Sequence, residues 1–244
     1  MKQKYPALNQ KDSQPVSTDD LLLKEGLLML GLEAEKIAPI ESTLIRYIAE
    51  IELFNPAYGL VKVQDRRELI VKHILDSLAP INFIRDLLNK SKAAGSAEVL
   101  TPQVADIGSG AGLPGIPLAA CLPGIQFSLV ERMGRRAGFL RNTLAVLNLP
   151  NLRVEETELE KIAVSAQQQF DLLVFRAFRP LEPSILKCLL KLLKPGGTLA
   201  AYKGRRLSVE EEMSPWENLH WEVFPLEVPF LKEERHLLFI HSKP

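Results

Sequence analysis

The 244-residue chain has the size and composition of an ordinary globular protein, and its bulk properties exclude several classes. Hydrophobic residues make up 46% of it, but its apolar runs are far shorter than the roughly 20 residues of a membrane-spanning helix. A formal net charge of zero argues against non-specific nucleic-acid binding, although a local basic patch could still face a structured RNA. No secretory pattern opens the chain, and its two cysteines lack the spacing of a zinc site. We therefore expect a cytoplasmic protein without a metal site.

The first third of the chain is predicted to be helical. Residues 1–16 are polar, contain two prolines and predict a disordered lead-in. Ser17 and Asp20 have the spacing of a capping box, which predicts that a helix begins there. Apolar residues recur at helical spacing over about residues 33–54, and another helix is predicted to begin near Asp65.

The rest of the chain alternates between strand-like and helix-like segments. The predicted strands cover residues 104–107, 127–131, 152–155, 170–175 and 197–203. The predicted helices between them cover about residues 113–122, 134–148, 157–166 and 181–193. This alternation predicts parallel β-α-β units with right-handed crossovers. Lys194-Pro195-Gly196-Gly197 predicts a turn before the fifth strand, and residues 221–224 and 236–240 predict an antiparallel hairpin at the sheet edge.

Two structural units are expected from these patterns. The small and polar residues 91–101 separate the helical part from the alternating part and predict a linker. We therefore expect an N-terminal helical cap over residues 17–92 and an α/β domain over residues 93–244.

The run VADIGSGAGLPGIP, residues 104–117, carries glycines in two overlapping patterns. From Gly108 it reads G-x-G-x-G, which is typical of a nucleoside cofactor and methyl transfer. From Gly110 it reads G-x-G-x-x-G, which is typical of a dinucleotide and hydride transfer. Glu131 closes the next strand, where a carboxylate can accept hydrogen bonds from both hydroxyls of a ribose.

Three features favour S-adenosylmethionine over a dinucleotide. Asp106 precedes the first glycine, where a carboxylate would repel a pyrophosphate and attract a methionine ammonium. Pro114 removes an N–H that a pyrophosphate could use, and Gly115 is expected to ease helix packing beside the loop. Five alternating strands followed by a hairpin fit the methyltransferase form of the doubly wound sheet. We expect the class I S-adenosylmethionine-dependent methyltransferase fold, which is Rossmann-like, with a mostly parallel seven-stranded sheet and the helical cap.

The segment after the fourth strand, FRAFRP at residues 175–180, bears on which atom is methylated. It has neither the Asn/Asp-Pro-Pro-aromatic sequence that holds an exocyclic amine nor a Pro-Cys nucleophile for attack on a pyrimidine ring. These absences disfavour amine methylation and cytosine carbon methylation. Guanine N7 already carries a free lone pair, so its methylation needs alignment and no general base.

Several polar residues allow two interpretations. His73 and Asp76 share a helix face, either as a solvated pair or as part of a site, and no third ligand with metal-site spacing accompanies them. Tyr58 either stacks on a splayed base or packs at a helix end. Arg176 lies in an apolar run at a carboxyl strand end, which predicts a buried partner. A solvated helix face or a phosphate-contacting patch would equally explain Arg132, Arg135, Arg136 and Arg141, joined by Lys203, Arg205 and Arg206.

The sequence resembles one family, the bacterial 16S ribosomal RNA guanine-N7 methyltransferases, also known as glucose-inhibited division protein B. The motifs that carry the resemblance are DIGSGAGLPGIPLA (106–119), NPAYGLV (55–61), VKHILDSL (71–78), FRAF (175–178), AYKG (201–204) and ERHLLFI (234–240). Their order is more specific than a single glycine-rich loop. The resemblance implies methyl transfer from S-adenosylmethionine to guanine N7 in 16S ribosomal RNA within the small ribosomal subunit, by a monomer that uses neither DNA nor a membrane.

Matching motifs and the loop analysis together assign candidate site residues. The expected cofactor residues are Asp106, Gly108, Gly110, Leu113, Glu131, Leu159, Glu160 and Arg176. Arg176 is expected to line both the cofactor and substrate pockets and to position the reactants. The expected substrate residues are Asn55, Tyr58, His73, Asp76, Lys203, Arg205 and Arg235; Ser77 and His236 lie in the same motifs.

The chain departs from the family pattern at three positions. Gly59 and Val61 replace an asparagine and a threonine, and Glu158 replaces an arginine before the adenine-contacting segment. These departures bear on the substrate side more than on the cofactor site. Alternative functions are a methyltransferase for another RNA or a small molecule, and a non-catalytic ribosome-assembly factor that binds the cofactor.

Overall fold

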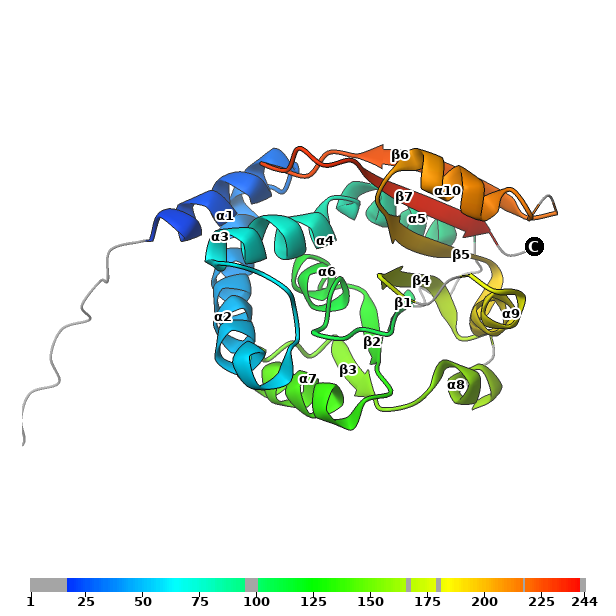
Figure 1. The fold of residues 1–244 in the computed structure, drawn as a ribbon, viewed down its shortest axis with the longest axis horizontal. Helices are drawn as coiled ribbons and strands as arrows, with labels where there is room; N and C mark the ends of the chain where they lie inside the picture. Colours follow the sequence, from blue (N-terminus) through cyan, green and yellow to red (C-terminus); the bar gives the residue numbers. More distant parts are fainter. Residues whose placement is uncertain (1–16, 95–100, 166–167, 179–180, 217, 242–244) are drawn as a thin grey trace, which may run out of the picture.

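A seven-stranded sheet forms the centre of the computed structural model, which describes residues 17–94, 101–165, 168–178, 181–216 and 218–241 (Figure 1). The strands are β1 (Gln103–Ile107), β2 (Gln126–Val130), β3 (Leu152–Glu155), β4 (Phe170–Arg176), β5 (Leu193–Lys203), β6 (His220–Leu226) and β7 (Arg235–His241). They are ordered β3-β2-β1-β4-β5-β7-β6. Strands β1 to β5 are parallel, and β7 runs antiparallel to both β5 and β6. The predicted fold, with its hairpin at the edge, is confirmed.

Helices cover both faces of the sheet. They are α1 (Thr18–Met29), α2 (Ala34–Tyr58), α3 (Arg66–Leu69), the π-helix η1 (Ile70–Leu75), α4 (Asp76–Leu78), α5 (Ile81–Ala94), α6 (Gly115–Cys121), α7 (Gly134–Leu147), α8 (Leu159–Ser165), α9 (Pro183–Leu192) and α10 (Arg206–Met213). Side chains alternate along each strand, so Leu172 and Val174 of β4 pack with α1 to α7, whereas Leu173 and Phe175 pack with α8 to α10. Burial on both faces explains why the central strands are continuously apolar.

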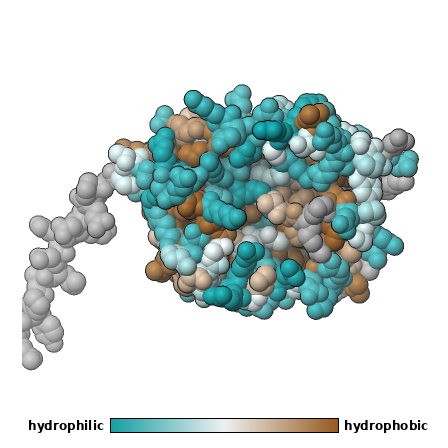
Figure 2. Space-filling model, viewed as in Figure 1, coloured by the Kyte–Doolittle hydropathy of each residue, from teal (hydrophilic) through white to brown (hydrophobic). Residues whose placement is uncertain are grey.

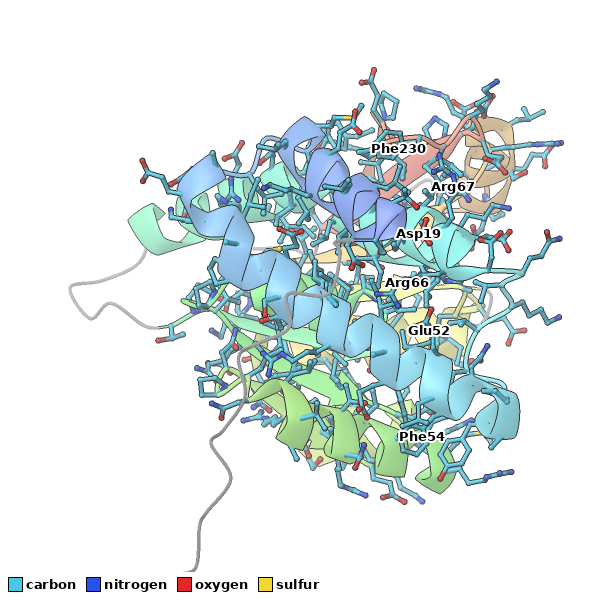
Figure 3. The ribbon with its side chains drawn as sticks, turned by 90° about the vertical axis from the view of Figure 1, so that its left-hand side faces the viewer. Asp19, Glu52, Phe54, Arg66, Arg67 and Phe230 are labelled. Carbon is cyan, nitrogen blue, oxygen red and sulfur yellow. The ribbon has the colours of Figure 1, made fainter. Side chains whose placement is uncertain are left out.

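The N-terminal helices and the sheet share one continuous hydrophobic core. As predicted, the Ser17 side chain caps α1 by accepting a hydrogen bond from the Asp20 N–H at 3.1 Å. Arg66 of α3 joins α1 to α2 by pairing with Asp20 and Glu52, and Figure 3 shows it between these two helices. The buried Tyr47 hydroxyl donates to the carbonyl oxygen of Ala111 at 2.7 Å, so α2 is fastened directly to the glycine loop.

Helix α5 extends into the predicted linker. Helix α5 continues to Ala94, so the linker prediction is wrong for residues 91–94, and the expected boundary after residue 92 falls inside this helix. Residues 95–100 and 1–16 lie outside the described parts of the chain. Residues 91–94 are small or polar, but lysine and alanine have high helix propensity, so the helix continues through them. The division into cap and domain stays a prediction.

Two features of the C-terminal half were not predicted correctly. Strand β5 begins at Leu193, four residues before the predicted start, and takes the Lys194-Pro195-Gly196-Gly197 segment into the sheet as a bulge opposite Phe170 and Leu172. Gly196 has a φ of +75°, which lets the strand change register there. Helix α10 was not predicted, and its buried residues are only Val209 and Met213.

The surface in Figure 2 is mainly hydrophilic, with apolar residues showing near its middle. In the described parts of the chain, none of the helices has the length and apolar character needed to cross a bilayer. Cys121 and Cys188 are both free thiols.

We expect Tyr47→Phe to lower the free energy of unfolding by about 1 kcal/mol, because the buried Ala111 carbonyl oxygen loses its donor. Urea unfolding followed by circular dichroism measures this change. Tyr58→Phe is the matched control, since Tyr58 is only partly buried, and its effect should stay within about 0.5 kcal/mol. Equal losses for the two variants would contradict the assigned role of the Tyr47 hydroxyl.

Candidate functional site

The glycine loop is folded tightly against the end of β2. The N–H groups of Gly108 and Ser109 both donate to the carbonyl oxygen of Val130, at 2.8 and 3.1 Å. Gly108 has a φ of +71°, a conformation that favours glycine. A Cβ atom on Gly115 would lie only 2.4 Å from the Leu129 side chain. Gly115 therefore permits close packing of α6 on the sheet. This packing role is the one expected when the glycine motif is read from Gly108.

Asp106 lies beneath this loop with no solvent exposure. Its Oδ2 accepts a hydrogen bond from the Gly115 N–H at 2.8 Å, and its Oδ1 is buried without a hydrogen-bond partner among the described residues. Burial is the main reason that the pKa of Asp106 is raised to about 7. Asp106 thus shapes the loop, and its Oδ1 is the atom left for the predicted contact with a methionine ammonium.

Glu131 holds the loop from the other side and is 4% exposed. Its Oε2 accepts from the Gly110 N–H at 2.9 Å, and its Oε1 accepts from the Met133 N–H at 2.8 Å. Each carboxylate oxygen has a second lone pair, so both can still accept from ribose hydroxyls. Glu131 lines a cavity of about 260 Å³ together with Gly108, Leu159 and Phe178, which we term the smaller cavity.

A second cavity of about 510 Å³, the larger cavity, is lined by residues of β4, β5, β7 and the N-terminal helices. It brings together five of the predicted residues: His73, Asp76, Arg176, Lys203 and Arg235. Arg176 lies at the end of β4, and its guanidinium forms hydrogen bonds with residues of η1 and α4. Its Nη1 donates to Asp76 Oδ2 at 2.8 Å and to the Lys72 carbonyl oxygen at 3.2 Å, and its Nη2 donates to His73 Nδ1 at 3.0 Å.

The π-helical turn η1 explains how three groups from one short segment reach the same guanidinium. A π-helical turn has a wider spacing of hydrogen bonds than an α-helix, and such turns are frequent at functional sites. Here the carbonyl oxygen of Lys72 bonds to Arg176, while His73 and Asp76 approach the same side chain. The sequence predicted a shared face for His73 and Asp76 and left the π-helical geometry open.

Neither His73 nor Asp76 is available as a general base. Burial, followed by the charge of Arg176, lowers the pKa of His73 to about 4, so its imidazole is neutral. Arginine can only donate, which makes His73 Nδ1 the acceptor and occupies its lone pair. Asp76 is also bound on both sides, because Arg235 Nε donates to its Oδ1 at 3.0 Å.

The larger cavity also contains residues that were not predicted as site residues in their own right. The Tyr202 hydroxyl donates to the Ser77 carbonyl oxygen at 2.8 Å, and His236 Nδ1 donates to the Gly204 carbonyl oxygen at 2.6 Å. Both line the cavity with Phe178. Their motifs, AYKG and ERHLLFI, lie at neighbouring strand ends, since Tyr202 and Lys203 face the first residues of β7 across the sheet. The pairing of these two strand ends is the feature from which Tyr202 and His236 could have been predicted as site residues.

Asn55 and Tyr58 shape the end of α2. Asn55 Oδ1 accepts from the Val61 N–H at 2.9 Å. The Tyr58 ring lies 5.5 Å from that of Phe54, and the guanidinium of Arg135 lies 5.0 Å from its centre. Neither residue lines the two cavities. For Tyr58 the structure favours packing over base stacking, and a substrate role for either residue stays a prediction.

Five more of the expected site residues also lie outside the two cavities: Asp106, Gly110, Leu113, Glu160 and Arg205. Leu113 belongs to the hydrophobic core, and Gly110 contributes its N–H to Glu131. Glu160 and Arg205 are exposed next to the cavity residues Leu159 and Gly204. Their predicted contacts with the cofactor and the substrate remain untested.

Much of the predicted basic patch is neutralised within the protein. Arg141 pairs with Glu156, Lys203 with Glu212, and Arg206 with Glu210, all within 2.7 Å. Arg135 contacts the end of α2 by donating to the Ala57 carbonyl oxygen at 3.2 Å. Arg132 and Arg136 line the smaller cavity. The part of the patch that remains for phosphate contacts is therefore narrower than the sequence suggested.

The departures from the family pattern have local structural explanations. Gly59 ends α2 with a φ of +58°, and glycine and asparagine are the residues best suited to this left-handed position. Val61 uses its backbone N–H to bond Asn55 and packs its side chain against the core. Glu158 is exposed, pairs with Lys161 at 3.5 Å and lies outside the smaller cavity, which Thr157 and Leu159 line.

Comparisons with known proteins agree with the sequence resemblance. A family model described as GidB, rRNA small subunit methyltransferase G, matches residues 40–238. A protein of Treponema denticola named ribosomal RNA small subunit methyltransferase G is 39% identical over 250 residues, which covers 94% of this chain and 97% of that protein. A protein with the same name from Stenotrophomonas maltophilia is 38% identical over 220 residues, with coverages of 89% and 92%.

Among solved structures, an S-adenosylmethionine-dependent methyltransferase from Aquifex aeolicus has a similar fold. Its TM-score is 0.52 at 16% sequence identity, and the match covers 80% of this chain and 97% of that protein. At this identity the likeness supports the fold class alone.

We expect Asp106→Asn to remove part of the pH dependence of stability. The pKa of Asp106 is raised from 3.8 to about 7, so the folded state holds this proton more tightly than the unfolded state. The free energy of unfolding of the wild type therefore falls as the pH rises through this window. Asparagine keeps an oxygen for the Gly115 N–H and does not titrate, so the variant gains stability relative to the wild type between about pH 4 and pH 7.

Urea unfolding of both proteins at several pH values measures this difference. A difference that stays constant across the window would contradict the raised pKa of Asp106.

Proposed function

This chain belongs to the rRNA small subunit methyltransferase G family, and we propose that it methylates N7 of a guanine in 16S ribosomal RNA with S-adenosylmethionine as the donor. The proposal includes action as a cytoplasmic monomer on the small ribosomal subunit, without a metal, DNA or a membrane. The choice of N7 is supported by the larger cavity, where Arg176 forms hydrogen bonds with both side chains that could act as a general base, His73 and Asp76.

We assign the smaller cavity to the cofactor and the larger cavity to the substrate. The smaller cavity lies at the carboxyl ends of β1, β2 and β4, and the larger cavity at those of β4 and β5. The strand order reverses between β1 and β4, and this is where doubly wound sheets bind ligands. In the proposal, Glu131 binds the ribose, Leu159 of α8 packs against the adenine, and Asp106 Oδ1 attracts the ammonium group. When bound, the cofactor supplies an electrophilic methyl group, which must face the larger cavity for transfer.

The residues of the larger cavity suit an acceptor that carries its own lone pair. The Lys203 ammonium pairs with Glu212 at 2.6 Å, and the Tyr202 hydroxyl donates to a backbone carbonyl. Guanine N7 needs no deprotonation before it attacks a methyl group, so the protein has only to align the two reactants. The hydrogen bonds that fix Arg176 and Asp76 make the cavity rigid enough for this task.

The polar groups of the larger cavity complement a guanine in an RNA strand. Arginine donors commonly bind guanine O6, and Arg235 lines the larger cavity beside Arg176. His236 donates from Nδ1 to Gly204, which leaves Nε2 as an acceptor for the N1–H or the 2-amino group of guanine. Lys72 and Lys203 also line the cavity, and each is paired with a glutamate, Lys72 with Glu68 and Lys203 with Glu212.

The decisive experiment incubates the purified protein with labelled S-adenosylmethionine and small subunits from a strain that lacks the gene. The label should appear in 16S ribosomal RNA as N7-methylguanine, mapped by cleavage at the modified base. Label in another RNA or a small molecule would favour an alternative substrate. Cofactor binding without any transfer would favour a non-catalytic assembly factor.

We expect Arg176→Ala to lower kcat/KM for methyl transfer by about 100-fold or more, because the groups that surround the acceptor lose their common partner. Arg176→Lys keeps the charge and should recover only part of the activity, since a lysine cannot bond several partners in one plane. Thermal unfolding checks that both variants are folded. Near-wild-type turnover of folded Arg176→Ala would contradict the assignment.

We expect Glu131→Ala to weaken cofactor binding chiefly, with a Kd for S-adenosylhomocysteine raised by about 10-fold or more, because a carboxylate hydrogen bond is lost. Isothermal titration calorimetry measures this constant. Glu155→Ala is a matched control at the end of the neighbouring strand β3, outside the smaller cavity, and should leave the Kd unchanged. An unchanged Kd for Glu131→Ala would exclude the ribose role.

A further inference from the structure

One short segment separates the smaller cavity from the larger cavity. Ala177 and Phe178 line both, whereas Glu131 lines only the smaller and Arg176 only the larger. In the proposed function, a methyl group passes from a cofactor in the smaller cavity to a base in the larger one. The side chain of Phe178 therefore lies next to the path of the methyl group.

The ring of Phe178 lies directly against the first glycine of the loop. A Cβ atom on Gly108 would lie 2.6 Å from Cδ2 and 2.9 Å from Cε2 of this ring, which is closer than carbon atoms pack. The ring thus occupies space that is open only because residue 108 is glycine. Glycine at this position also allows a ligand to approach the backbone closely, so the ring and a cofactor compete for one surface.

The backbone before Phe178 directs the ring to this place. Ala177 has a φ of +51°, a left-handed conformation that is unfavourable for a residue with a Cβ atom. It follows β4 immediately, and the turn brings the Phe178 ring to 5.9 Å from the ring of Phe175. Unfavourable conformations of this kind are concentrated at functional sites.

We propose that Phe178 is a substrate-positioning residue whose ring has two places. Without cofactor it covers Gly108, and with cofactor in the smaller cavity it turns to the larger cavity and packs against the face of the guanine. Aromatic side chains commonly stack on splayed RNA bases in this way. The first movement follows from steric competition at Gly108, whereas the second place rests on the proposed function.

The variant Phe178→Ala tests both parts with the full-length chain. Removal of the ring frees the surface of Gly108, so the Kd for S-adenosylhomocysteine, measured by calorimetry, should fall at least about threefold. The guanine loses its aromatic contact, so KM for small ribosomal subunits should rise at least about fivefold. Phe178→Leu keeps much of the bulk without the flat ring, and should raise KM similarly while leaving the Kd close to that of the wild type.

Phe230→Ala is the matched control, because Phe230 is 37% exposed, lines neither cavity and lies at the surface in Figure 3. It should leave both constants unchanged. An unchanged or higher Kd for Phe178→Ala would overturn the competition at Gly108, and an unchanged KM for both Phe178 variants would overturn the contact with the base. If the wild type methylates no ribosomal RNA, the proposed function fails, but the Kd comparison still decides the competition at Gly108.

Discussion

The ion pair between Arg176 and Asp76 is the contact on which the arrangement of the site depends. It joins the end of β4 to α4 across 100 residues of sequence, and both side chains are largely buried. Loss of one member of a buried pair leaves an uncompensated charge, at a cost of roughly 3–5 kcal/mol. Arg235 of β7 binds the other oxygen of Asp76, so the N-terminal helices, the parallel sheet and the edge hairpin are fixed together at the larger cavity.

Carboxylates have a second structural role in the glycine loop. Asp106 and Glu131 each accept a hydrogen bond from a loop N–H, at Gly115 and Gly110. These two hydrogen bonds give the loop a defined shape before any ligand binds. A preformed loop and a fixed Arg176 suit a reaction in which the protein mainly aligns two reactants.

The sequence predicted those elements whose signals are local. The capping serine of α1, the helical period of α2 and the alternation of strands and helices depend on residues a few positions apart, and the structure confirms them. Helix α10 was missed because a short helix with few buried residues leaves little periodic signal, and the end of α5 was missed because its small and polar residues resemble a linker. The start of β5 was missed because Gly196 serves a bulge, and local sequence does not distinguish a bulge from a turn.

Neighbouring residues are enough to identify the class of fold, the frame of the glycine loop and the motifs of the family. Which side chains contact one another depends on the packing of the whole chain. It placed His73 and Asp76 on Arg176, tied Glu131 to the loop and laid the ring of Phe178 over Gly108. The residues of these hydrogen-bonded pairs lie 21 to 103 positions apart in the chain. Their contacts therefore follow from the packing of distant segments and cannot be predicted from local sequence.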